Sequence, residues 1–348
     1  ASGRRTAWAD KHPAYDLVNG PSGKGVDDLF TPEITNPVGF DATVSVVCTA
    51  ENDAKKVQAV VNEIHGRDHA GRPVGAVPAL FGMNFQAVSV GEKLTHDNAD
   101  PSCNAADGAR LRGKSGGYLD ALGLPTEVLQ YGLDKTDAAL GAMITALKQT
   151  GRYERTLFVV SAKHGQAPID PAKVNKPGHL QDLVAALPGS ATNPAAQAIA
   201  NAAVTDDDVA LIWLQDQSQT DAVAAFLRAN QKALFIQDVL SDELLKQGFN
   251  DPKHDNRTPD IIVLPNFGTI FTTSGKKLAE HGGFSHDDTN VALLMSNPSM
   301  RPQVIKTPVQ TLQIAPTILE ALGIEPEALQ AVRKEHTQVL PGLGGNEE

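Results

Sequence analysis

The sequence lacks several features that define whole classes of protein. None of its apolar runs approaches the ~20 residues that a membrane-spanning helix needs, so we expect no membrane span. Basic side chains are in the minority: 30 Lys and Arg face 41 Asp and Glu, which gives a net charge of −11. This balance argues against a surface for a nucleic acid polymer, although a small anion could bind in a local basic cleft.

Cysteine is scarce, with Cys48 and Cys103 as the two in the sequence. Neither has a second cysteine at zinc-finger spacing, which argues against a metal site built from cysteines. One disulfide and two buried thiols both remain open, because the sequence does not give the Cα separation that a disulfide requires. The first residues, from Ala1 to Arg5, have no apolar stretch behind them, so we recognise no secretory signal peptide.

The N-terminal third mixes turn formers with a few regular segments. Turn formers such as Asn36 and Pro37 are frequent in the first forty residues, so we expect irregular surface chain there. The β-branched run at 42–47 predicts a strand, and helical spacing of apolar residues from Asp53 onward predicts a helix. Two more short strands are expected within residues 76–90.

The rest of the chain alternates helical and apolar extended segments. Helices are expected at 125–151, 220–230 and 309–322, and strands at 156–161, 209–214, 233–236, 260–264 and 291–295. Residues 170–258 are richer in Ala, Asn and Asp, which indicates an inserted cap lobe. We predict an α/β fold in which residues 1–169 and 259–348 form a mostly parallel central sheet flanked by helices.

Two histidines lie at or near the ends of predicted core strands. His164 directly follows the strand at 156–161, and His281 lies in a Gly-rich loop with His286 close behind. Ligands of open α/β sheets bind beyond such strand ends, and imidazole is a preferred ligand of zinc. Asp10, in the N-terminal loop, is a further candidate ligand. For each of these residues a hydrogen-bonded or solvated loop position is the alternative.

Four strings in this order resemble the alkaline phosphatase superfamily, and within it the type I phosphodiesterase/nucleotide pyrophosphatase family. They are DKTDAALG at 134–141, RTLFVVSAKHG at 155–165, EHGG at 280–283 and VQTLQIAPTILEALGIEP at 309–326. The resemblance implies hydrolysis of phosphate mono- or diesters, nucleotide-like ones included. It also implies divalent metal ions, zinc in most members, beside a Thr or Ser nucleophile.

The resemblance carries over to this sequence at specific residues. His164 would ligate one metal ion and His281 the other. The family has Asp-His-Gly where this chain has Lys163-His164-Gly165. An ammonium ion near a dication is repelled, so Lys163 is expected to assist by stabilising phosphoryl charge directly.

Two further departures from the family pattern concern the rest of the site. The segment expected to supply an Asp and a His before the long helix has Gln86 instead. The family's opening strand, with its nucleophile, has no counterpart in the sequence. Loss of such a strand would expose unpaired edges, so a missing N-terminal fragment is a candidate partner.

These observations support two hypotheses on function. The first is a metal-dependent phosphoric ester hydrolase that acts on a small phosphate ester. The second is a catalytically silent relative, or a proteolytic fragment, that binds a phosphate-like anion without turnover. Because members of the superfamily are often exported, the resemblance also implies a periplasmic or extracellular location.

Overall fold

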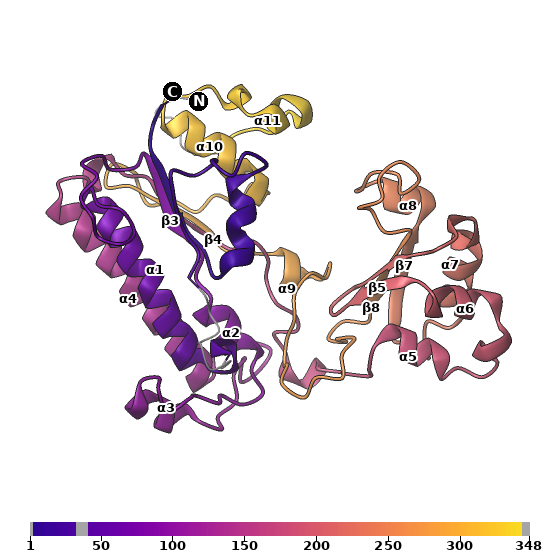
Figure 1. Cartoon of the computed structure of the whole chain (residues 1–348). Coiled ribbons are helices and arrows are strands. Elements are labelled where there is room, and N and C mark those ends of the chain that lie inside the picture. Colours follow the sequence, from indigo (N-terminus) through magenta and orange to yellow (C-terminus); the bar gives the residue numbers. More distant parts are fainter. Residues whose placement is uncertain (1–2, 33–40, 343–348) are drawn as a thin grey trace.

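The computed structural model describes residues 3–32 and 41–342 as two groups of helices and strands. Figure 1 shows the larger group around α1 and α4, and the smaller one around β5 to β8. The strands are β1 (Thr6–Ala9), β2 (Asp28–Phe30), β3 (Leu80–Met83), β4 (Phe158–Ser161), β5 (Ala203–Asp206), β6 (Ala210–Trp213), β7 (Ile236–Ser241), β8 (Ile261–Pro265) and β9 (Leu293–Ser296).

The helices differ widely in length. They are α1 (Val46–Ile64), α2 (Ala87–Lys93), α3 (Ala105–Leu111), α4 (Glu127–Gln149), α5 (Leu180–Ala185), α6 (Pro194–Ala200), α7 (Thr220–Ala229), α8 (Asp242–Lys246), α9 (His286–Thr289), α10 (Ile314–Ala321) and α11 (Gln330–Glu335). None of the helices in the described part is long and apolar enough to cross a bilayer. Among the predicted helices, 125–151 and 220–230 correspond to α4 and α7, whereas α10 begins later than the predicted start at 309.

The first sheet is parallel and has the order β2-β1-β3. It corrects the expectation of irregular chain at the N-terminus, because β1 and β2 lie within the first forty residues; Asn36 and Pro37 lie outside the described residues. Apolar side chains of this sheet pack on α1 and α4 in one cluster, which includes Ala9, Ile64 and Leu147. Helices therefore cover one face of a parallel sheet, the arrangement expected for an α/β fold.

The strand predicted at 156–161 forms, but its pairing differs from the prediction. β4 pairs antiparallel with β9, with Val159 opposite Met295, in a sheet of two strands. Phe158 nonetheless belongs to the same apolar cluster as β1 and β3, so both sheets lie on the α1–α4 layer. β3 and β4 each have one unpaired edge within the described residues, and the apolar side chains of β4 are only half-buried. An unpaired edge of this kind can accept another strand.

The second lobe, defined as β5 to β8 with α5 to α8, contains an antiparallel sheet of order β5-β6-β8-β7. Its own core is apolar and includes Ile212, Leu227, Val263 and Phe271. The strand predicted at 260–264 forms as β8, but it lies in this sheet and not in the central one. The sequence misplaced it because a continuous apolar run indicates burial without indicating which sheet is joined.

The β-branched run at 42–47 does not form the predicted strand: residues Ala42–Val44 form a 3-10 helix, and α1 begins at Val46. Ser45 caps α1: its hydroxyl accepts hydrogen bonds from the amides of Val47 and Cys48. Asp97 accepts hydrogen bonds from the Val46 amide, at 2.7 Å, and from the Ser45 hydroxyl. A cap and burial of the first turn therefore outweigh the strand preference of valine.

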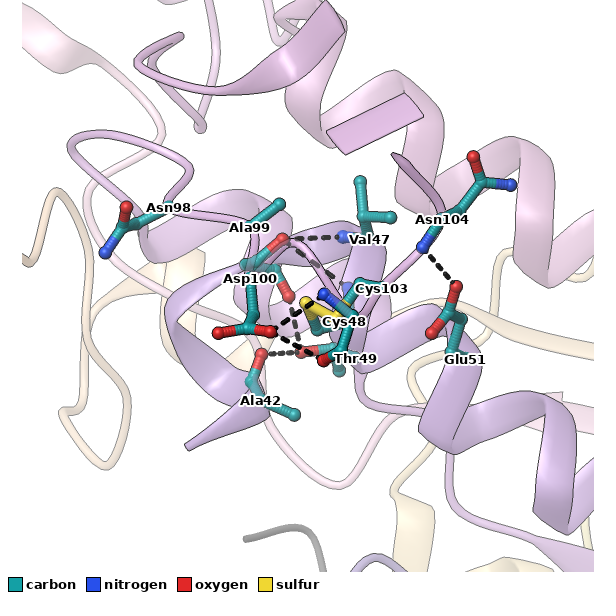
Figure 2. Close-up of a disulfide and its surroundings, with 12 residues drawn as sticks. Ala42, Val47, Cys48, Thr49, Glu51, Asn98, Ala99, Asp100, Cys103 and Asn104 are labelled. Atoms are coloured by element: carbon teal, nitrogen blue, oxygen red, sulfur yellow. Dashed lines mark hydrogen bonds between the residues drawn. A yellow bond between two sulfur atoms is a disulfide. The ribbon is translucent and has the colours of Figure 1, made fainter. Parts of the chain in front are cut away.

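The two cysteines form a disulfide, which decides between the alternatives that the sequence left open. Cys48 on α1 and Cys103, before α3, have Cα atoms 5.3 Å apart. Figure 2 shows the bond beside Thr49, with the Asn104 amide donating to the Glu51 carboxylate nearby. The bond therefore holds the segment before α3 against the first turns of α1.

Removal of this disulfide should destabilise the protein. The cysteines are 55 residues apart, and loop closure over that length contributes about 4 kcal/mol in the chain-entropy estimate. We expect the double substitution Cys48→Ala and Cys103→Ala to lower the free energy of unfolding by ~2–4 kcal/mol in denaturant titrations. Equal stability of the variant and the oxidised protein, together with two titratable thiols in the native protein, would contradict the disulfide.

Candidate active site

Two loops that are far apart in the sequence are joined by backbone hydrogen bonds. The amide of Ala167 donates to the Glu280 carbonyl at 2.8 Å, and the amide of Glu280 donates to the Ala167 carbonyl at 2.9 Å. His164 lies three residues before one of these positions, and His281 directly follows the other. This reciprocal pair brings the two strand-end loops of the sequence prediction to one place.

Gly165 allows a second contact between the same regions. Its amide donates to the carbonyl of Asp288 at 2.6 Å. A Cβ atom at Gly165 would lie 1.9 Å from the carbonyl oxygen of Asp287, so no side chain fits there. Glycine is required here for the close approach of two backbones and not for a left-handed conformation, because its φ lies outside that region.

The rings of His164 and His281 lie against each other. Their centroids are 4.0 Å apart and their planes make an angle of 32°. Nδ1 of His164 lies 2.8 Å from the carbonyl oxygen of Gly165, an acceptor that favours a proton on Nδ1. That tautomer leaves Nε2 with a lone pair, as a metal ligand or a proton acceptor requires.

Both imidazoles are kept neutral by their surroundings. Burial lowers the pKa of His281 to about 4, and the charge of Lys93 and the neighbouring His164 add to the effect. Burial also lowers the pKa of His164, with further contributions from the positive charges of Lys163, Lys93 and Lys11. At neutral pH the pair is therefore uncharged, within electrostatic reach of three lysines.

Lys163 points toward the N-terminal segment, where Tyr15 receives it. Its Nζ donates to the Tyr15 hydroxyl at 2.8 Å and lies 4.9 Å from the centre of that ring. Lys11 lies over the same ring at 5.4 Å. Burial opposes ionisation of Tyr15, but the Lys163 hydrogen bond and the Lys11 charge outweigh it and lower the pKa of the phenol.

Glu280 balances part of this positive charge. It is buried, and its carboxylate accepts hydrogen bonds from Lys93 on α2 and forms an ion pair with Lys277 at 2.9 Å. Burial opposes its ionisation, but Lys93 and Lys277 lower its pKa below the usual value. Two lysines, Lys93 and Lys277, are therefore held around one buried carboxylate next to His281.

The two remaining predicted ligands do not join the histidine pair. Asp10 is buried at the end of β1, where it accepts hydrogen bonds from Trp8, the Lys11 amide and Asn84. The side chain of His286, on α9, is 80% exposed, and its Nδ1 lies 3.9 Å from Oδ1 of Asp287. Within residues 3–32 and 41–342, no three His, Cys, Asp or Glu side chains gather as a metal would require.

Sequence reasoning missed the residues that set the charge of the site. Lys11 and Tyr15 lie in a segment without a recognised motif, and Lys93 is an ordinary basic residue in the last turn of α2. Gln86, expected to replace a metal-binding pair, precedes α2, and its amide donates to the Asp53 carboxylate on α1 at 2.9 Å. Lys11, directly before His12, was the available signal, but nothing in that segment of the sequence indicated contact with His164.

Three solved structures have folds similar to that of this chain. A murine ectonucleotide pyrophosphatase/phosphodiesterase 5 in complex with AMP aligns with 93% of this chain and 68% of its own, at 14% identity and a TM-score of 0.56. Phosphonoacetate hydrolase from Sinorhizobium meliloti 1021 aligns with 92% of this chain and 71% of its own, at 17% identity and a TM-score of 0.50. The alkaline phosphatase PafA aligns with 80% and 50%, at 16% identity and a TM-score of 0.51. The chain therefore has the alkaline-phosphatase-like α/β fold, as predicted.

The sequence itself narrows the assignment. Residues 117–287 match the type I phosphodiesterase / nucleotide pyrophosphatase family. No curated protein matches the sequence significantly. The predicted resemblance is confirmed for this region: the residues that match the type I phosphodiesterase / nucleotide pyrophosphatase family include both His164 and His281.

The lowered pKa of His281 predicts a specific pH dependence of stability. Its folded pKa of about 4 lies below the ordinary 6.5, so between these values the unfolded chain binds more protons and stability falls as the pH falls. We expect His281→Gln to weaken this decline of stability, measured as the melting temperature between pH 7 and pH 4. This range spans the ordinary pKa of histidine and the lowered pKa of His281. His286→Gln, on the exposed α9 position, serves as the control. Parallel melting curves for His281→Gln and the native protein would refute the shift.

Proposed function

We propose that the protein binds small phosphate esters at the His164–His281 pair and hydrolyses them with the help of a divalent metal ion. The observation that carries this proposal is the placement of two neutral imidazoles beside Lys11, Lys93 and Lys163. Neutral imidazole is the form that binds zinc, and ammonium groups attract a phosphoryl anion. The family match over residues 117–287 and the AMP complex of the murine structure support the same ligand class.

The donor set fits a metal ion with open coordination positions. His164 and His281 would supply two nitrogen ligands, which leaves the other positions of a tetrahedral ion to water and substrate oxygens. A bound ion would polarise the phosphoryl oxygen. Among the chain's own residues, Lys163 would neutralise phosphoryl charge in place of a second ion, and Tyr15 would hold its ammonium group in position.

Binding without turnover is the second candidate function. It is favoured by the small number of metal-ligand side chains around the histidines and by Lys163 in the position of an expected carboxylate. In that case the lysines and the imidazoles would recognise the anion by charge and hydrogen bonds alone. Turnover of a phosphodiester separates the two candidates directly.

The open edges of β3 and β4 support a further proposal. Both strands pack on the α1–α4 layer, and each leaves one edge unpaired among the described residues. A strand from a polypeptide segment other than residues 1–348 would satisfy both edges and bury the half-exposed side chains of β4. Such a segment is also a candidate source of the nucleophile. The disulfide supports a periplasmic or extracellular site of action.

We propose the second lobe as a cap over this site. The sequence predicts the cap at residues 170–258, and in the structure β8 extends the sheet of this lobe to Pro265. Ala167 lies between β4 and α5, and Glu280 lies between β8 and α9, so the joined loops belong to the two segments that connect the lobe with the larger group. A lobe with these connections is suited to cover a bound ligand.

The histidine pair should be required for metal binding. We expect His164→Gln and His281→Gln each to weaken zinc binding by at least about tenfold in titration calorimetry, because each removes one of two nitrogen ligands. In the same preparations, hydrolysis of a chromogenic phosphodiester should fall together with zinc binding. His286→Gln, which leaves the pair intact, should change neither; equal affinities for all four proteins would refute the site.

Lys163 offers a test in the opposite direction. Replacing this ammonium group with a carboxylate adds a metal ligand and changes the local charge by two units. We therefore expect Lys163→Asp to raise zinc affinity and, through loss of the cation, to weaken inhibition by inorganic phosphate. Lys148→Asp, an exposed position on α4, controls for net charge. An unchanged zinc affinity of Lys163→Asp would remove Lys163 from the site.

A further inference from the structure

A cavity of about 360 Å³ separates the second lobe from the loop that follows His281. The turn between β5 and β6 contributes Asp208 to its wall, and α9 contributes Asp288. In Figure 1, α9 lies between the two groups of elements, where the second lobe meets the larger group. The cavity therefore lies where the two groups of elements meet, and none of the lysines near the histidine pair lines it.

The two carboxyl groups in this wall are buried and face each other. Asp208 is 6% exposed and Asp288 is 4% exposed. No donor among the described residues reaches either carboxylate oxygen of Asp208, or Oδ1 of Asp288. The second oxygen of Asp288 accepts a hydrogen bond from the Ser285 hydroxyl at 2.7 Å.

Burial and the neighbouring carboxylates oppose ionisation of this pair. Burial raises the pKa of Asp208 to about 9, with the carboxylates of Asp288 and Glu280 as the next causes. The ammonium group of Lys277 is already shared between Asp207, the neighbour of Asp208 in the sequence, and Glu280. Three unpaired carboxylate oxygens in one wall thus lack a cation among the described side chains, and buried charge without a partner is costly.

We propose that Asp208 and Asp288 bind a divalent cation that prefers oxygen ligands, of the calcium type. Two carboxylates and the Ser285 hydroxyl would supply part of the six to eight oxygens that such an ion takes, and water in the cavity would supply the rest. The absence of a three-residue His, Cys, Asp and Glu group in the described chain is compatible with this set, because hydroxyl and water oxygens complete it.

The position of the ion would give it a structural role. The backbone carbonyl of Asp288 accepts a hydrogen bond from the Gly165 amide. Gly283 lies so close to the Asp288 carboxylate that a Cβ atom added at Gly283 would be 2.6 Å from it. An ion between Asp208 and Asp288 would therefore tie the second lobe to the segment that holds both histidine loops. This inference does not depend on the proposed hydrolase activity.

The test is calcium binding by the metal-free full chain. We expect one calcium ion per chain in titration calorimetry and a rise in melting temperature on its addition. Asp208→Asn keeps the shape of the side chain but removes its charge, and should weaken calcium binding by about a hundredfold or more. Asp207→Asn is the matched control, because it removes the same charge from the same turn without removing a residue that lines the cavity.

Three results would overturn the proposal, and they are distinguishable from failure of the hydrolase site. Calcium uptake that Asp208→Asn leaves intact would place the ion elsewhere. Uptake weakened equally by Asp207→Asn would indicate a general effect of charge. No uptake, with Asp208→Asn more heat-stable than the native protein, would show a protonated carboxyl pair. The double substitution His164→Ala and His281→Ala should keep the calcium response whatever its effect on zinc.

Discussion

The reciprocal hydrogen bonds between Ala167 and Glu280 are the constraint on which the functional region depends. They join two segments that the intervening second lobe separates in the sequence. Backbone hydrogen bonds fix position more firmly than long side chains do, because few dihedral angles remain to be ordered. The 4.0 Å approach of the two imidazoles follows from this joint, and from the glycine at 165 that lets Asp287 and Asp288 come close.

Burial disfavours ionisation on both sides of the Ala167–Glu280 hydrogen bonds, but the neighbouring charges are positive near the histidines and negative near Asp208. On the side of Tyr15, burial and lysine charges favour neutral imidazoles, and the lysines lower the pKa of the phenol although burial opposes its ionisation. On the side of the second lobe, burial and neighbouring carboxylates favour a protonated or cation-bound Asp208. The proposed anion site and the proposed cation site therefore lie within a few residues of each other along the chain. Glu280 takes part on both sides, because it pairs with Lys93 and Lys277 and its charge also raises the pKa of Asp208.

Sequence patterns predicted the elements that repeat a local signal and missed those set by tertiary contacts. The long α4 helix and the strand–His164 junction were recognisable because periodicity and an apolar run are local properties. The start of α1 was not, because Asp97 and the Ser45 cap decide it from a distance. The pairing of the histidines came from family resemblance, whereas Lys11, Tyr15 and Lys93 meet them only through folding.

The division of the strands explains why the predicted central sheet was only partly right. β4 was expected to be a buried parallel strand, yet its open edge and half-buried valines show that its environment is incomplete within the described residues. β1 and β3 satisfy the parallel prediction on the same helix layer. The two sheets therefore pack on the same helices, α1 and α4, but no strand of one pairs with a strand of the other among the described residues. The apolar run of β4 is typical of a buried parallel strand, whereas the structure pairs it antiparallel with β9 and leaves its side chains half-buried.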